Sequence, residues 1–239
     1  MKFAAIVVAA GRGVRFGQPK QLVEVAGRPL VAWSLATFAS LEEIDDLVIA
    51  TELEYVERMQ DLARGYAPRL SATVVGGGAT RQQSARAALA AVPAHCDAAF
   101  IHDGARPLVL AADVRAAMTI VKPGIGALIA APVVDTIKVV ERGSTRVSRT
   151  LERASLWAAQ TPQFGTVADL VRAHEAAHAE RFEATDDAML LERIGVRVEI
   201  VAAGGENFKV THATDRDLAE VLLRERAAAE RGRPAPVRP

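Results

Sequence analysis

Residues 2–20 read KFAAIVVAAGRGVRFGQPK, and this stretch predicts both the fold and the class of ligand. The apolar run up to Val8 is typical of a parallel strand that is buried on both faces. The loop that follows, Ala9–Lys20, combines glycines with basic side chains. Glycine lets the backbone approach an anion closely, so that several N–H groups can converge on phosphate oxygens. The stretch therefore indicates a strand that runs into a phosphate-binding loop.

Two common phosphate-binding motifs do not fit this loop. A dinucleotide-binding G-x-G-x-x-G that starts at Gly11 needs a glycine where the chain has Phe16, and a Walker-type loop needs Gly-Lys where it has Phe16-Gly17. The loop instead reads G-x-G-x-R and continues into Pro19-Lys20-Gln21. This pattern resembles the nucleotide-binding signature of the sugar-phosphate nucleotidyltransferases. The alternative is a glycine-rich turn with incidental surface charges.

Composition and length limit the class of protein. The chain has 239 residues, half of them hydrophobic, and its 29 basic residues balance 29 acidic ones. This length suits one large α/β domain, and the zero net charge argues against a general binder of nucleic acid or membrane surfaces. The single cysteine, Cys96, cannot form an intramolecular disulfide, which favours a cytoplasmic location. We expect one domain over residues 1–228 and a disordered tail over 229–239.

Apolar strand patterns then alternate with helical ones. This rhythm predicts right-handed crossovers and a doubly wound, mostly parallel α/β sheet of the Rossmann-like kind. Ligands of such sheets bind at the carboxyl ends of the strands. The predicted elements are a helix that begins near Gly27, with an apolar stripe of Leu30, Val31, Leu35 and Phe38, then strands over 46–51, 71–75 and 98–103, with a helix over 54–64 between the first two strands.

Two further loops follow predicted strands. After the strand over 71–75 the chain reads GGGATRQQS, from Gly76 to Ser84, and leads into an alanine-rich helix. Thr80 and Gln83 match a capping box, which is the purely structural interpretation. The functional interpretation adds Arg81 and Ser84 on the first turns of the helix and a glycine run that admits a flat base or a phosphate.

The strand over 98–103 ends in HDGARP, residues 102–107. Asp103 could accept hydrogen bonds from sugar hydroxyls or help to hold a divalent cation, and Arg106 offers a planar guanidinium to a phosphate. A buried ion pair between these two residues that closes the loop is the structural alternative.

These three loops, in this order and at these distances, resemble the 2-C-methyl-D-erythritol 4-phosphate cytidylyltransferases of the non-mevalonate isoprenoid route. The resemblance continues through four more motifs, which are PVVDTIK at 132–138, LWAAQTPQF at 156–164, ATDD at 184–187 and NFKVT at 207–211. It implies that the chain transfers CMP from CTP to 2-C-methyl-D-erythritol 4-phosphate. A cytidylyltransferase for another polyol phosphate, such as ribitol 5-phosphate, would have the same CTP half.

The resemblance also implies roles for particular residues, with Mg²⁺ bridging the CTP phosphates. The CTP triphosphate is expected on Gly11, Gly13, Arg15 and Lys20, and the rest of the nucleotide near Ala9, Ala10, Gly78, Ser84, Asp103 and Ala105. The methylerythritol phosphate is expected near Asp103, Arg106, Thr136, Arg153, Thr161, Thr185 and Lys209. Arg15, Lys20 and Lys209 would stabilise charge on the reacting phosphates, and Asp103 could also contact the metal. Where some members have Gly-Asp, this chain has Gly78-Ala79, so a side-chain contact to cytosine there must be absent or replaced by backbone groups.

Residues 136–161 predict a β-hairpin inserted late in the fold. In the family such an arm exchanges with a partner subunit, which implies a homodimer in which Arg153 could serve the other active site. A non-catalytic nucleotide-binding module is a further alternative, which the presence of Lys20 and Lys209 disfavours. A more distant one is a zinc hydrolase, because residues 174–178 read HEAAH and match the H-E-x-x-H pattern through His174 and His178. We favour the alternative, an alanine-rich solvated helix in which His, Glu and Ala recur by composition.

Overall fold

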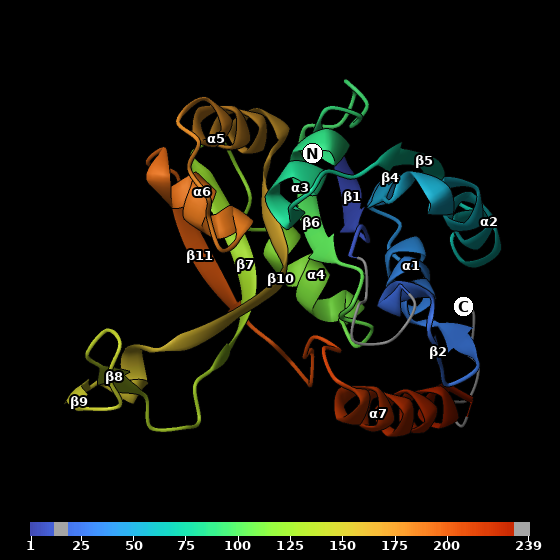
Figure 1. The fold of residues 1–239 in the computed structure, drawn as a ribbon. Coiled ribbons are helices and arrows are strands. Elements are labelled where there is room, and N and C mark those ends of the chain that lie inside the picture. The colour runs from blue at the N-terminus through green and yellow to red at the C-terminus, as the bar shows by residue number, and fades with distance from the viewer. Residues whose placement is uncertain (12–18, 232–239) are drawn as a thin grey trace, which may run out of the picture.

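A seven-stranded sheet forms the centre of the protein in the computed structural model, which describes residues 1–11 and 19–231. The strand order is β11-β7-β10-β6-β1-β4-β5, so the first strand lies inside the sheet (Figure 1). The strands are β1 (Phe3–Val8), β4 (Ile44–Thr51), β5 (Ser71–Gly76), β6 (Ala98–Asp103), β7 (Ile125–Pro132), β10 (Trp157–Thr166) and β11 (Arg197–Ala202).

The sheet is mostly parallel, as the sequence predicts. β1 pairs in parallel with β4 and β6, β4 pairs in parallel with β5, and β11 pairs in parallel with β7. β10 is the exception, because it runs antiparallel to both β6 and β7. β4 lies on one side of β1 and β6 lies on the other. The carboxyl ends of these three strands are therefore the place where such a fold binds ligands.

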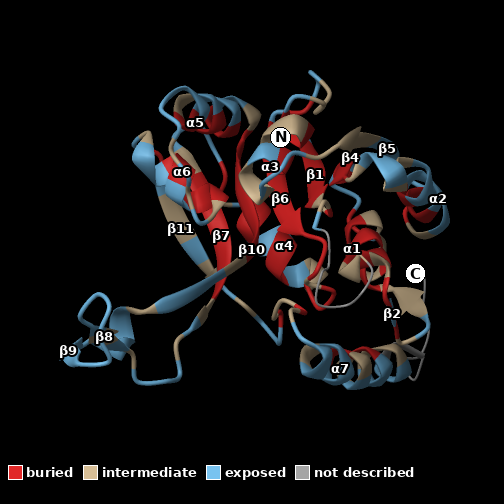
Figure 2. Ribbon diagram, in the orientation of Figure 1, coloured by how far each residue is buried: buried red, intermediate tan, exposed pale blue. Residues whose placement is uncertain are grey.

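Helices cover both faces of the sheet, and alternate residues of β1 point to each face. Phe3, Ala5 and Val7 pack with α1, α2 and α4, while Ala4 and Ile6 pack with α3, α5 and α6. Figure 2 shows the buried residues concentrated in the strands and on the inner sides of these helices. The helices are α1 (Leu30–Ala39), α2 (Val56–Tyr66), α3 (Arg81–Leu89), α4 (Ala111–Met118), α5 (Val167–Ala179) and α6 (Asp187–Arg193).

The predicted elements agree closely with the observed ones in this half of the chain. β6 has the predicted bounds, and the four apolar residues of the predicted stripe on α1 are buried. The helix expected from residue 54 begins instead with a 3₁₀ turn, η3 (Leu53–Tyr55), before α2. A small hairpin of β2 (Glu24–Val25) and β3 (Arg28–Pro29), preceded by the 3₁₀ turn η2 (Lys20–Leu22), occupies the segment before α1.

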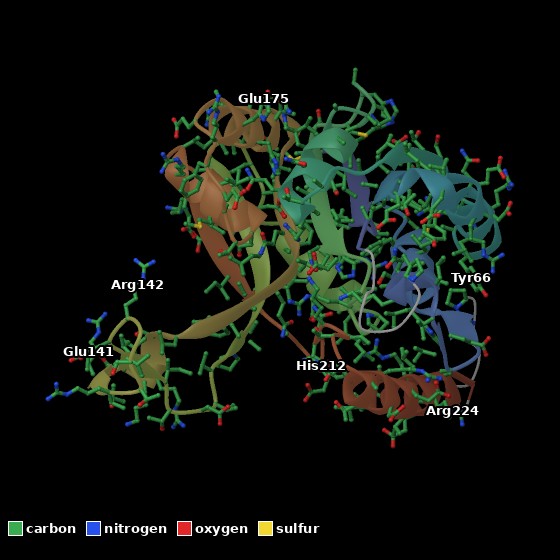
Figure 3. All side chains as sticks on the ribbon, in the orientation of Figure 1. Tyr66, Glu141, Arg142, Glu175, His212 and Arg224 are labelled. Carbon is green, nitrogen blue, oxygen red and sulfur yellow. The ribbon has the colours of Figure 1, made fainter. Side chains whose placement is uncertain are left out.

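The predicted hairpin arm is present and extends from the body of the protein (Figure 1). It consists of β8 (Lys138–Val140) and β9 (Val147–Thr150), followed by the 3₁₀ turn η4 (Arg153–Ser155). Glu141 and Arg142 lie near its tip (Figure 3). The arm ends earlier than expected, because β10 begins at Trp157 and runs back into the central sheet.

The C-terminal helix α7 (Ala213–Arg231) packs on the β2–β3 hairpin. Ala219 and Leu223 share a buried cluster with Val25 and Leu30, and the Glu220 carboxylate accepts a hydrogen bond from the Ala26 N–H at 2.7 Å. The helix ends at Arg231, three residues past the expected end of the domain at 228, and the rest of the expected tail lies outside the described residues. Within residues 1–11 and 19–231, no helix is both long enough and apolar enough to cross a membrane.

Candidate functional site

A pocket of about 800 Å³ opens at the carboxyl edge of the sheet. Its walls come from the ends of β1, β4 and β6, from the turn between β5 and α3, and from the segment before α7. The described residues that line it are Val8, Ala9, Ala10, Gly11, Lys20, Gln21, Glu52, Leu53, Gly77, Gly78, Ala79, Thr80, Arg81, Ser84, Asp103, Gly104, Ala105 and Lys209.

One end of the pocket is a charge cluster around Asp103, the last residue of β6. Its carboxylate accepts from Arg81 Nε at 2.7 Å and from Lys209 Nζ at 2.9 Å. Arg106 Nε lies 3.7 Å from the same carboxylate. The Asp103–Arg106 pair considered from the sequence therefore exists, but the carboxylate makes its shorter contacts with residues from two distant segments. The three cations outnumber the two buried carboxylates that they contact, Asp103 and Asp187, so this end of the pocket carries net positive charge.

The neighbouring charges shift the pKa values of the buried groups. Burial acts to raise the pKa of Asp103, but Arg81 and Lys209 outweigh it and hold that pKa well below its ordinary range. Burial acts to lower the pKa of Arg81, but Asp187 and Asp103 raise it above the usual arginine value. Asp103 is therefore ionised and Arg81 charged throughout the physiological range.

Arg81 connects the pocket to the layer formed by α5 and α6. Its NH2 lies 2.8 Å from Asp187 Oδ2, while Asp187 Oδ1 lies 3.1 Å from His174 Nε2. Asp187 and His174 are both fully enclosed, with side chains only 1% exposed. The first residue of α3 is thus held on two sides by carboxylates, which fixes the direction of its guanidinium toward Asp103.

A buried hydrogen-bond network holds Asp103 and the end of β6 in place. The Asp103 N–H donates to Thr161 Oγ1 at 3.0 Å, and Thr161 Oγ1 lies 3.1 Å from His102 Nδ1. Burial lowers the pKa of His102 to about 4, so its ring is neutral at pH 7. His102 Nε2 bonds to the carbonyl of Arg106. Arg106 NH1 in turn donates to the carbonyl of Asn207. Arg106 and Thr161 therefore position the end of β6, and neither lines the pocket.

The other end of the pocket is the glycine-rich turn before α3. The Thr80 side chain caps this helix by accepting from the Gln83 N–H at 3.1 Å, and Gln83 Oε1 accepts from the Ala79 N–H at 2.9 Å. The first half of the predicted capping box is confirmed, and its second half reaches one residue further back. Gly77 packs so closely that an added Cβ would lie 2.4 Å from the Ala10 Cβ. Capping and ligand binding are therefore compatible interpretations of the same turn.

Most of the residues expected at CTP and at the reacting phosphates come together in this pocket. Those that line it are Ala9, Ala10, Gly11, Lys20, Gly78, Ser84, Asp103, Ala105 and Lys209. Lys20 Nζ donates to the Val210 carbonyl at 3.2 Å, which brings the end of the first loop beside the segment that carries Lys209. Gly13 and Arg15 lie outside the described residues.

Five of the seven residues expected near the second substrate do not line the pocket, and Arg106 and Thr161 are two of them. Thr136 and Thr185 are exposed, and Arg153 lies on the arm segment, where its NH1 donates to the Val134 carbonyl at 2.7 Å. Glu52 and Leu53 are lining residues that the sequence reasoning missed. Their position directly after the strand over 46–51 was a usable signal, because ligands of parallel sheets bind at the carboxyl ends of the strands.

The HEAAH segment does not form a metal site among the described residues. His174 points into the core toward Asp187, whereas His178 is exposed and Glu175 pairs with Arg86 at 2.7 Å on the outside of α5 (Figure 3). In the part of the chain that the structure describes, the one group with metal-ligand spacing is Asp46, His95 and Cys96. Asp46 lies at the start of β4, at the opposite end of that strand from the pocket. Because His174 is buried against Asp187 and His178 is exposed, the zinc hydrolase hypothesis has no site at residues 174–178.

Comparison with known protein families gives a match over nearly the whole chain. Residues 3–225 match the family model described as 2-C-methyl-D-erythritol 4-phosphate cytidylyltransferase. The chain belongs to this family. A cytidylyltransferase of that description from Thermosynechococcus vestitus is 39% identical over 227 residues, covering 94% of this chain and 97% of the relative. Another from Dictyoglomus thermophilum is 35% identical over 223 residues, covering 93% and 96%.

Solved structures of the cytidylyltransferase family share the fold. The enzyme from Thermus thermophilus superimposes with a TM-score of 0.73 at 33% identity, covering 94% of this chain and all of the other. A 4-diphosphocytidyl-2C-methyl-D-erythritol synthase from Anaerococcus prevotii gives 0.83 at 25% identity, covering 93% and 96%. The α/β nucleotidyltransferase fold and the assignment as a nucleotidyltransferase enzyme are thereby confirmed.

Proposed function

We propose that this chain transfers the cytidylyl group of CTP to 2-C-methyl-D-erythritol 4-phosphate in the pocket at the carboxyl edge of the sheet. The products are 4-diphosphocytidyl-2-C-methyl-D-erythritol and pyrophosphate. The observation that carries the proposal is the charge cluster of Arg81, Asp103 and Lys209 at one end of a pocket whose other end is lined by glycines. Such a division suits a nucleotide, with the triphosphate at the charged end. Membership of the family supports the choice of both substrates.

The reaction needs positioning and charge neutralisation more than covalent help. A phosphate oxygen of the acceptor attacks the α-phosphorus of CTP, the bond to the β-phosphate breaks, and pyrophosphate leaves. Lys20 and Lys209 lie in the pocket as compact positive charges for the oxygens around the α-phosphorus and the leaving group. The Lys209 side chain is 38% exposed, so it can turn from Asp103 toward a phosphate. Arg15 is proposed for the same role from the sequence.

A divalent cation such as Mg²⁺ would bind at this end of the pocket together with the triphosphate, whose negative charge offsets the cations already there. The two oxygens of Asp103 accept from Arg81 and Lys209, and each keeps a further lone pair. Mg²⁺ is usually held by one or two carboxylates together with substrate phosphates, so Asp103 and the triphosphate would hold it here. When bound, the cation would neutralise charge on the phosphate oxygens.

The arm supports a homodimer. Val140 and Val147 on the hairpin are 48% and 53% exposed, and Val134 and Trp157 at its base are 77% and 39% exposed. Contact with a second copy of the chain would bury these side chains and could bring Arg153 to the acceptor side of a neighbouring site. Mass measurement by light scattering should give twice the 25.4 kDa chain mass, and Val147→Asp should shift the protein toward monomer.

A cytoplasmic location is proposed from the state of the cysteine. Cys96 is free and buried, and burial together with Asp46 raises the pKa of its thiol to about 12. A protonated thiol of this kind is unreactive and consistent with a reducing compartment.

Pyrophosphate release tests the proposed reaction. The purified protein is incubated with CTP and Mg²⁺ and with methylerythritol 4-phosphate, with ribitol 5-phosphate or with no acceptor. Release with the first acceptor alone is expected. Release only with ribitol 5-phosphate would keep the CTP site and overturn the acceptor, and absence of release in all three mixtures would overturn the proposed function.

A further inference from the structure

Glu52 places a carboxylate in the pocket that takes no part in the proposed reaction. It directly follows β4, occupies the N-cap position of the 3₁₀ turn η3 without a capping hydrogen bond from its side chain, and lines the pocket. Its Oε1 is buried and has no hydrogen-bond partner among the described residues. Glu52 also forms no ion pair within 4.0 Å with any described residue. A buried carboxylate oxygen without a donor is costly, so this position calls for a donor from a ligand.

The position of Glu52 in the sheet separates it from the charge cluster. Asp103 ends β6 and Glu52 follows β4, with β1 between the two strands. Two strand spacings amount to about 10 Å. On the side of Glu52, the Gly77 N–H donates to the Thr51 carbonyl at 2.6 Å, which joins the end of β4 to the glycine-rich turn. Glu52 therefore belongs to the glycine-lined end of the pocket, where a flat base fits.

The backbone amides of this turn are already used. The Gly78 N–H donates to Ser84 Oγ at 3.1 Å, and the Ala79 N–H donates to Gln83 Oε1 at 2.9 Å. Ala79 has no polar side chain to offer a base. Among the described residues that line the pocket, the two carboxylates are those of Asp103 and Glu52, and Asp103 is paired with cations. Glu52 thus remains as the ionisable acceptor at the base end.

We propose that Glu52 determines the choice of nucleobase by accepting a hydrogen bond from the exocyclic amino group of cytosine. The inference rests on the proposed function, which puts CTP in this pocket. An ionised carboxylate can only accept hydrogen bonds. Cytosine offers an N–H₂ group at the position where uracil presents a carbonyl oxygen, so the same carboxylate attracts the first base and repels the second. Glu52 would supply the side-chain contact that Ala79 cannot make.

The charge of Glu52 also favours one orientation of the nucleotide. A triphosphate placed at the glycine-lined end would meet a carboxylate, whereas at the opposite end it meets Arg81 and Lys209. Like charges repel and opposite charges attract more strongly in a partly desolvated pocket. The two ends of the pocket thus direct the base and the phosphates to different places.

The test compares CTP with UTP. Values of kcat/KM are measured for both nucleotides, with methylerythritol 4-phosphate and Mg²⁺, for the unmodified protein, Glu52→Gln and Glu52→Ala. The expected result is a loss of roughly 10- to 100-fold for CTP, as for a hydrogen bond to a charged group. The loss for UTP should be smaller, or UTP should improve, so that the preference for CTP falls at least tenfold. Glu57→Gln, on the exposed first turn of α2, is the matched control and should keep the preference.

Other outcomes separate the two proposals. An equal loss for CTP and UTP in both Glu52 variants would overturn base recognition and point to a contact with the ribose. An unchanged preference would assign recognition to the carbonyls of the turn instead. If the unmodified protein does not turn over CTP at all, the proposed function fails. In that case equilibrium binding of CTP and UTP to the same variants still tests Glu52, and equal affinities would overturn its role.

Discussion

The Nζ of Lys209 lies 2.9 Å from Oδ2 of Asp103, and this ion pair joins residues 106 positions apart in the chain. Asp103 is buried at the end of β6, whereas Lys209 is partly exposed on the segment before α7. The pair therefore links a rigid strand end to a segment from the far end of the chain. It also keeps a partly exposed cationic side chain beside the site proposed for the phosphates.

Replacement of Lys209 should reduce catalysis more than binding. We expect Lys209→Ala to lower kcat by roughly 10²- to 10³-fold, because the lysine acts on charge that develops at the α-phosphate during the reaction. The KM for CTP should change much less, since Arg81 and Lys20 still line the pocket. Steady-state kinetics measure both values. Lys122→Ala, an exposed position outside the pocket, is the control, and near-normal turnover of Lys209→Ala would remove Lys209 from catalysis.

Arg81 should be important for stability as well as for binding. Arg81→Met leaves the fully buried Asp187 without its guanidinium partner, and loss of one member of a buried ion pair costs about 3–5 kcal/mol. Urea unfolding measures this change in the free energy of unfolding. On the same helix, Arg86→Met removes only an exposed pair with Glu175 and should change the free energy of unfolding far less. Equal effects of the two substitutions would show that Asp187 does not depend on Arg81.

A methyl group at Gly77 should disturb the nucleotide site. The added Cβ would lie 2.4 Å from the Ala10 Cβ and 2.9 Å from Ser84 Oγ, so the ends of two loops must move apart. We expect Gly77→Ala to lower kcat/KM for CTP by roughly 10- to 100-fold, because small displacements of positioning groups are costly. Gly65→Ala, where the Cβ meets open space in α2, should leave kcat/KM unchanged. A Gly77→Ala protein with full activity would mean that this close approach is not required.

The buried His102 should make the protein sensitive to acid. Its pKa is about 4 in the folded protein, against an ordinary value near 6.5, because burial disfavours the charged ring. The unfolded chain therefore takes up a proton below about pH 6.5 that the folded protein refuses until about pH 4. The free energy of unfolding should fall across this window by roughly 3 kcal/mol as the pH decreases. Protonation of Asp103, whose pKa is held low, would add to the loss only at lower pH.

Unfolding measured between pH 7 and pH 4 tests this prediction with two variants. His102→Gln should flatten the dependence, because glutamine does not titrate. The exposed His178→Gln should keep the slope of the unmodified protein. If all three proteins show the same slope, His102 does not control it.

The sequence was most informative where a whole element is buried. β6 has its predicted bounds because all six of its residues lie in the core, which gives an uninterrupted apolar pattern before His102 and Asp103. The stripe on α1 was predictable for the same reason. β10 was not predicted as a strand of the central sheet, because its first residues are exposed and its antiparallel partners come from distant segments.

The site was only partly predictable for a related reason. Local motifs identified the loops that carry Lys20, Ser84 and Asp103, because each follows a recognisable strand. The bond between Arg81 and Asp187 joins residues from separate motifs, and only the folded chain brings them together. Glu52 was missed because the pattern around it reads as the start of a helix.

Phosphorus NMR of the complete reaction mixture tests the central claim most directly, because it shows which bond of CTP breaks. With CTP, methylerythritol 4-phosphate and Mg²⁺, the signals of the triphosphate and of the acceptor monophosphate should be replaced by those of pyrophosphate and of a new diphosphate diester. A spectrum that instead shows orthophosphate with CDP, or CMP with an unchanged acceptor, would contradict cytidylyl transfer by this protein.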